Sequence, residues 1–180
     1  MLCSCATRAP GTASVTAASG AAATPELRSR VETLLAQPES ADPAAAWKAL
    51  GPSALGPVTE AYQDPRRPVE ARTRAVSALA WVANPGAGAA LQEILKDAAA
   101  AVGFRAAAMR ALAQRDGPSS VGQLKPLLIQ DAPELRTAAA GALGLAGGDE
   151  ARKSLEERLA EEENVGVREA LQQNLSKVQP

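Results

Sequence analysis

Two cysteines near the N-terminus are the residues of this sequence best suited to covalent or metal chemistry. Cys3 and Cys5 form a C-x-C motif, in which a disulfide would close too short a loop to stabilise a fold, and the two thiolates supply at most half of a metal site. The sequence contains no histidine, which removes the commonest general base and most zinc, copper and non-haem iron sites. We therefore expect no metal, no cofactor and no enzymatic activity.

Glycine-rich and acidic segments do not supply a catalytic site either. Gly86-Ala87-Gly88 and the segment 144–148 follow no expected strand, so we interpret them as helix ends and turns rather than phosphate-binding loops. The acidic run Glu161-Glu162-Glu163 is interpreted as a solvated face, with an acidic docking edge as the alternative. The formal net charge is −1, so the chain lacks the surplus of basic residues that binding a nucleic-acid backbone requires.

The elements that must position these residues are repeated helices. Four segments carry an arginine followed seven residues later by a leucine: ARTRAVSAL (71–79), FRAAAMRAL (104–112), LRTAAAGAL (135–143) and VREALQQNL (167–175). Their arginines are Arg72, Arg105, Arg136 and Arg168, at separations of 33, 31 and 32 residues. An i, i+4 apolar pair precedes each segment: Val58 and Tyr62, Leu91 and Leu95, Leu124 and Leu128, Leu155 and Leu159. Each unit is thus two short antiparallel helices, and stacking the units buries a continuous apolar seam.

The amino-acid composition predicts the domain organisation. Hydrophobic residues make up 46% of the chain but aromatic residues only 2%, so alanine and leucine must form a core of closely packed helices. We expect an all-α, right-handed α-solenoid over residues 25–178. Its units would be 25–51 (an irregular N-terminal cap), 53–83, 87–115, 118–147 and 149–178. Residues 1–24 are rich in small and hydroxyl side chains and are interpreted as a disordered linker or tether.

The repeat resembles HEAT repeats, particularly their short, alanine-rich bacterial form. In that form the first helix ends in L-x-D, the turn carries Asp-Pro, and the second helix begins V-R-x-x-A-A-x-A-L-G. The matching segments here are LKD (95–97), QDP (63–65) and LRTAAAGALG (135–144). The resemblance covers residues 53–178 closely and 25–51 loosely, although the period is shorter than the usual 40–47 residues or so. It also implies a hydrogen-bonded ladder of turn aspartates and second-helix arginines, with Asp64 beside Arg72 and Asp97 beside Arg105.

A second resemblance concerns the first residues. Leu2-Cys3-Ser4-Cys5 resembles the end of a bacterial lipoprotein signal, which implies that Cys5 carries a lipid, that residues 6–24 form a tether, and that the protein lies in the cell envelope on the periplasmic side. Such a signal needs a charged start and an apolar region, which would have to lie upstream of Met1. The alternative is a plain linker on a cytoplasmic protein. No stretch approaches the roughly 18 apolar residues of a transmembrane helix.

Outward positions on the second helices are the candidate partner-binding residues, because second helices line the concave face of the solenoids that this chain resembles. Trp81 aligns by the period with Gln114, Leu145 and Lys177, two of which are polar, so it is expected to face outward. Tryptophan and arginine are enriched among the residues that dominate interfaces. The candidates are Trp81, Arg74, Arg110 and Gln114. The alternative for Trp81 is packing in the core.

These features favour a non-catalytic scaffold that presents a concave helical surface to another protein. Contact with a membrane is expected only through a lipid anchor at Cys5, and no nucleic-acid partner is expected. The alternative function is a ligand- or cofactor-handling protein, such as a bilin lyase-type subunit, which rests on analogy of fold alone. A nucleic-acid binder is less favoured, since positive charge is not clustered.

Overall fold

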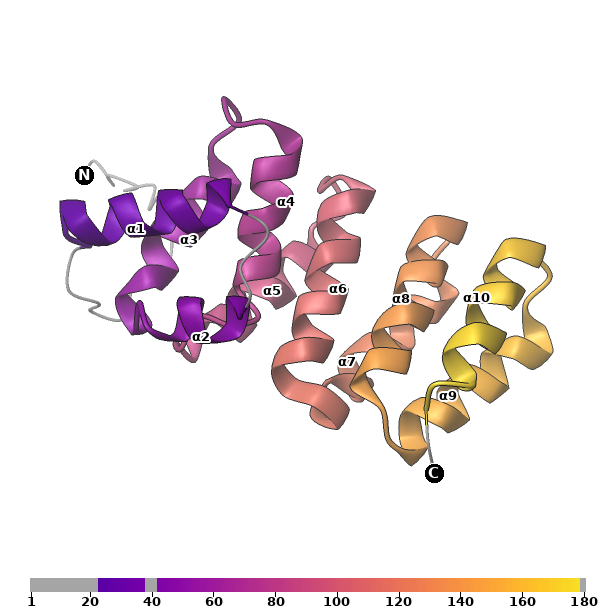
Figure 1. Cartoon of the computed structure of the whole chain (residues 1–180). Helices are drawn as coiled ribbons and strands as arrows, with labels where there is room; N and C mark the ends of the chain where they lie inside the picture. Colours follow the sequence, from indigo (N-terminus) through magenta and orange to yellow (C-terminus); the bar gives the residue numbers. More distant parts are fainter. Residues whose placement is uncertain (1–22, 38–41, 179–180) are drawn as a thin grey trace, which may run out of the picture.

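The computed structural model describes residues 23–37 and 42–178, and these residues form helices and turns without a strand (Figure 1). The α-helices are α1 (Pro25–Ala36), α2 (Pro43–Lys48), α3 (Leu55–Gln63), α4 (Val69–Ala78), α5 (Gly86–Lys96), α6 (Val102–Asp116), α7 (Val121–Leu124), α8 (Pro133–Ala146), α9 (Asp149–Glu161) and α10 (Val165–Leu175). Three 3₁₀ helices accompany them: η1 (Pro52–Ala54), η2 (Gly117–Ser120) and η3 (Lys125–Ile129).

The helices are stacked as antiparallel pairs, which confirms the predicted α-solenoid. The second helices α4, α6, α8 and α10 follow one another along the stack, and the contacts between α6 and α8 and between α8 and α10 are the most extensive in the fold. In Figure 1 these second helices stand side by side, with α5, α7 and α9 behind them. The second helices therefore form one face of the stack from α4 to α10.

The period places the core correctly. The register leucines Leu79, Leu112 and Leu143 are completely buried, as are Val58, Leu91, Leu124 and Leu155 from the first helices, whereas the last register leucine, Leu175, is partly buried. Buried alanines such as Ala108 and Ala139 fill the space between neighbouring second helices. At Gly144 the fit is tightest, because a Cβ built there would lie 2.7 Å from Cβ of Asn174 on α10. Small side chains thus let α8 and α10 approach closely, as the composition predicts.

The first helix of the third unit differs from the regular helix that the sequence suggests. The segment 117–129 is divided into η2, α7 and η3. Pro126 lies at the start of η3 and cannot donate a backbone hydrogen bond, so a continuous α-helix is interrupted there. Leu124 and Leu128 nevertheless remain buried, so the apolar seam continues through this unit.

Three of the four register arginines cap helices and none of the four pairs with the expected turn aspartate, so the expected ladder was wrong. Arg72 Nε donates to the carbonyl of Tyr62 (2.7 Å), and Arg168 donates to the carbonyls of Leu159 and Glu162 (3.0 and 2.8 Å). These carbonyls end the preceding helix, where backbone acceptors lack partners within the helix. Asp64 instead accepts from Arg66, and the Asp97 carboxylate accepts from the backbone N–H of Ala99.

Two of these arginines also reach into the next unit. Arg105 of α6 donates to the Gln130 side chain (3.0 Å), and Arg136 of α8 donates to the Glu162 side chain. Gln130 and Glu162 lie 32 residues apart and occupy the same place after the first helix of successive units. These two contacts therefore connect the second regular unit to the third and the third to the fourth.

The N-terminal pair is placed differently from the other units. In Figure 1, α1 runs across the direction of α4 and α6 rather than beside them. Val31 and Leu35 of α1 and Trp47 of α2 are buried, so the pair is anchored through apolar side chains. Arg74 of α4 donates through Nε to the carbonyl of Leu35 near the end of α1 (2.7 Å). This pair covers the N-terminal end of the second-helix face.

Candidate functional site

A groove of about 500 Å³ crosses the face formed by the second helices. Its floor consists of residues with little or no side chain: Gly103, Ala106, Ala107, Ala138, Gly141, Ala142 and Ala170. Its walls are polar: Thr73, Ser77, Arg110, Thr137, Gln173, Asn174 and Lys177. The repeat explains this arrangement, since residues one period apart occupy equivalent places on successive helices and the outward places of α6 and α8 are mostly alanine or glycine.

The groove carries positive charge. Arg110 and Lys177 are its ionisable lining residues, and both are exposed. Glu70 and Glu134 lie in the first turns of α4 and α8, Asp116 ends α6, and Glu169 lies near the middle of α10; none of them lines the groove. Acidic residues near helix N-termini are favoured by the helix dipole. Because no carboxylate lines the groove, Arg110 and Lys177 leave it cationic.

The four predicted partner-binding residues fall in different places. Arg110 lines the groove, and Gln114 is exposed one turn further along α6 but outside the lining. Trp81 lies in the turn after α4 and is partly buried against the core, and Arg74 is also partly buried. Both line a separate cavity of about 140 Å³ together with Leu34, Leu35, Gln37, Pro43, Trp47 and Ser77.

The N-terminal pair accounts for this separation. Helices α1 and α2 contribute Leu34, Leu35 and Trp47 to the cavity, so they lie over the outward positions that α4 would otherwise present. Ser77 lines both the cavity and the groove, which places the two next to each other. The repeat period predicts that Trp81 faces outward, away from the core. It does not indicate that another helix pair covers that position. Sequence reasoning missed the bare floor on α6 and α8, although the aligned alanines and glycines indicate it.

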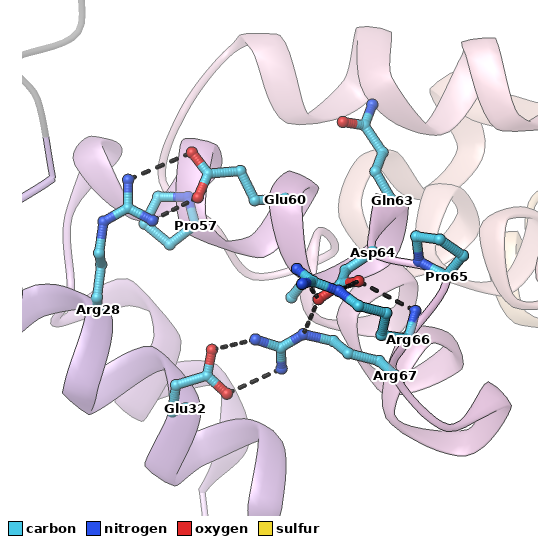
Figure 2. A pocket seen from close by; sticks show the side chains of 10 residues that line it. Arg28, Glu32, Pro57, Glu60, Gln63, Asp64, Pro65, Arg66 and Arg67 are labelled. Carbon is cyan, nitrogen blue, oxygen red and sulfur yellow. Dashed lines mark hydrogen bonds and ion pairs between the residues drawn. The ribbon is translucent and has the colours of Figure 1, made fainter.

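A cavity of about 620 Å³ lies between α1, α3 and the turn before α4, and Figure 2 shows its side chains. Its charged groups form pairs: Arg28 with Glu60, Arg67 with Glu32 (2.5 Å), and Arg66 with Asp64 (3.0 Å). Hydrogen bonds from these guanidinium groups lower the pKa of each of the three carboxyl groups. Because the charges cancel within the cavity, we interpret it as the joint between the N-terminal pair and the first regular unit.

A second ionic cluster lies near the C-terminus, and it corrects part of the interpretation of the acidic run. Glu162 is only 3% exposed and accepts hydrogen bonds from Arg136 and Arg158. The bonds from Arg136 contribute most to lowering its pKa, to about 2. Glu161 and Glu163 on either side are exposed. The run is therefore a solvated face at two positions and a structural ion pair at the third.

Within 23–37 and 42–178, no group of three or more Cys, Asp or Glu side chains is arranged to hold a metal ion. In that part of the chain, no helix combines the length and apolarity needed to cross a membrane. Cys5, the predicted lipidation site, lies outside the described residues.

Comparison with known proteins agrees with the architecture. The family model of HEAT repeats matches residues 102–176, which span α6 to α10 and contain most of the groove. Comparison with curated proteins found no match. HEAT repeats commonly mediate protein–protein interaction. The matched segment, the stacked helix pairs and the recurring arginine–leucine register together support a HEAT-like α-helical repeat architecture.

Proposed function

We propose that this protein is a non-catalytic scaffold that binds a protein partner in the groove on its second-helix face. The observation that carries the proposal is the continuity of the groove, to which α4, α6, α8 and α10 all contribute residues. A floor of alanine and glycine lets a partner backbone approach closely, and the hydroxyl, amide and cationic groups of the walls supply hydrogen bonds. Such a surface suits recognition of a peptide segment or helix.

Arg110 is the centre of the proposed interface, with Gln114 beside it. Arg74 and Trp81 extend the interface toward the N-terminal pair, and this extension is supported by Ser77, which lines both hollows. The variant Trp81→Ala tests the extension. Weaker partner binding with an unchanged melting midpoint would support it, and a lower midpoint with unchanged binding would restrict the interface to the groove.

The proposal includes a lipid anchor at Cys5 that holds the scaffold at a bacterial envelope. The motif Leu2-Cys3-Ser4-Cys5 and the small, polar composition of residues 6–24 support this part. Mass spectrometry of the membrane fraction from cells producing the native precursor should find Cys5 diacylated. An unmodified Cys5 in a soluble protein would remove the anchor and leave the scaffold proposal unaffected.

Site-specific photocrosslinking in cells that produce the protein tests the scaffold proposal. A photoreactive amino acid at Gln173, in the groove, should capture one recurring protein partner, whereas the same group at Lys153, exposed on α9, should not. Adding Gly141→Leu to the Gln173 probe should abolish capture, because the leucine side chain fills the groove floor where a Cβ would meet open space. Capture that is equal at both positions, or that persists after the Gly141→Leu substitution, would contradict the proposal.

A further inference from the structure

Arg110 differs from every other arginine on the second helices. Six of them donate hydrogen bonds that cap helices or join units: Arg72, Arg74, Arg105, Arg115, Arg136 and Arg168. Arg110 has no hydrogen-bond or ion-pair partner among the residues that the structure describes, and it is exposed in the groove. The structural uses of arginine in this fold therefore do not account for Arg110.

Lys177 gives the groove a second cation. Its Nζ donates to the neutral side chain of Asn174 (3.2 Å), and no carboxylate pairs with it within the described part of the chain. Arg110 belongs to α6, and Lys177 follows α10, so α8 lies between them. There α8 contributes only Thr137, Ala138, Gly141 and Ala142 to the lining. The two cations thus flank a strip of α8 that is almost bare of side chains.

An exposed apolar side chain lies near the end of the same strip. Leu145 is 49% exposed, and the period places it between the equivalent positions Gln114 on α6 and Lys177 after α10. An apolar residue of a partner that packs on Leu145 and the alanines would bring neighbouring residues of that partner toward the cations. Leu145 therefore adds an apolar contact to the charge of the groove.

We infer that the groove binds an acidic segment of a partner protein, with Asp or Glu side chains paired to Arg110 and Lys177 and an apolar residue on the α8 floor. The inference rests on the proposed function, whose partner it specifies. Carboxylates match this surface because arginine binds them with two parallel hydrogen bonds and because complementary charge directs association. A nucleic acid fits less well, since the groove lining supplies two cations, Arg110 and Lys177, whereas binding a phosphate backbone requires many clustered basic residues.

Selection from a random peptide display library tests the inference while the natural partner is still unidentified. The full chain is used as bait, and peptides that also bind the Gly141→Leu variant are removed. The peptides that remain should be enriched in Asp and Glu together with an apolar residue. The double variant Arg110→Glu/Lys177→Glu should select peptides enriched in Lys and Arg instead.

A matched control separates local charge from net charge. The variant Lys96→Glu/Lys153→Glu changes the net charge equally, but its residues lie on the first helices α5 and α9, outside the groove. It should still select acidic peptides. A selected acidic peptide should bind the groove double variant at least about tenfold more weakly than the control, and its affinity for the wild type should fall as salt concentration rises.

The outcomes distinguish the inference from the function on which it rests. Groove-dependent peptides that are neutral or basic would overturn the acidic partner while leaving the groove as a protein-binding site. The absence of any groove-dependent peptide would also overturn the inference, and photocrosslinking at Gln173 would then decide the scaffold proposal independently. If a labelled oligonucleotide binds through Arg110 and displaces the selected peptide, the groove binds a nucleic acid and the inference of an acidic protein segment is overturned.

Discussion

Arg136 of α8 and Glu162, which follows α9, form an ion pair with two parallel hydrogen bonds. Nε of Arg136 donates to Oε2 of Glu162 (2.7 Å), and Nη2 donates to Oε1 (2.9 Å). Arg136 also caps the preceding segment through the carbonyls of Gln130 and Asp131. One side chain therefore joins two neighbouring units, and in a solenoid this kind of contact transmits stability along the chain.

This ion pair predicts a stability loss at low pH. The pKa of Glu162 in the folded protein is about 2, below its ordinary value of 4.5. A carboxyl group whose pKa is lowered by folding stabilises the protein fully above its unfolded pKa, and this stabilisation is lost as pH falls toward the folded pKa. Chemical denaturation should show the stability of the wild type falling between about pH 4.5 and about pH 2, and Glu162→Gln should reduce this slope.

At neutral pH, Glu162→Ala should lower the free energy of unfolding by about 3 kcal/mol, because it leaves partly buried arginines without their acceptor. Glu161→Ala is the control, since the Glu161 side chain is 75% exposed and its loss should change stability by less than about 0.5 kcal/mol. Equal effects at the two positions would contradict the structural role of Glu162.

Two glycines of α8 should respond to alanine in opposite directions. At Gly144 a Cβ would lie 2.7 Å from Cβ of Asn174, so Gly144→Ala forces α8 and α10 apart and should cost about 1–3 kcal/mol. At Gly141 a Cβ meets nothing within 4 Å, and alanine is the better helix former, so Gly141→Ala should stabilise by about 0.5–1 kcal/mol. Thermal unfolding of both variants measures the difference. Equal shifts would show that α8 and α10 are not closely packed at Gly144.

Two leucines of the same helix test the register. Leu143 is fully buried, and Leu143→Ala should cost about 2–5 kcal/mol by leaving a cavity. Leu145, two residues away, is 49% exposed, and Leu145→Ala should cost less than about 1 kcal/mol. Denaturant unfolding followed by circular dichroism gives both values. A reversed order would mean that the helix is rotated from the orientation described.

The N-terminal pair should depend on apolar packing more than on its ion pairs. Leu35 of α1 is buried where the pair attaches, so Leu35→Ala should cost about 2–5 kcal/mol in the stability of the attachment. Glu32, whose side chain is 51% exposed, pairs with Arg67, and Glu32→Gln should cost at most about 1 kcal/mol.

Tryptophan fluorescence reports on this attachment directly. The protein has two tryptophans, and both Trp47 and Trp81 line the cavity beneath the N-terminal pair. Leu35→Ala should move their emission to longer wavelength at a lower denaturant concentration than the wild type, while Glu32→Gln should leave this transition nearly unchanged. A larger shift for Glu32→Gln would mean that the ion pair carries the attachment.

The sequence by itself determined the repeated part of this protein. The spacing of Arg72, Arg105, Arg136 and Arg168 indicated the second helices, and the register leucines Leu79, Leu112 and Leu143 are buried as predicted. A periodic apolar pattern is local information, because the residues that share a helix face are close in the chain. The division of 117–129 into η2, α7 and η3 was not predicted, although Pro126 explains it because proline cannot donate a backbone hydrogen bond.

The tertiary structure alone decided what each polar side chain contacts. Arg72 caps a carbonyl instead of pairing with Asp64, Arg136 reaches Glu162 in the next unit, and Trp81 lies beneath the N-terminal pair. These contacts join residues that the period places on separate elements, so they depend on how far the helices stand apart and how they cross. Arg110 shows the consequence for function: its repeat position resembles that of other outward residues, but only the packed structure leaves it facing a bare groove.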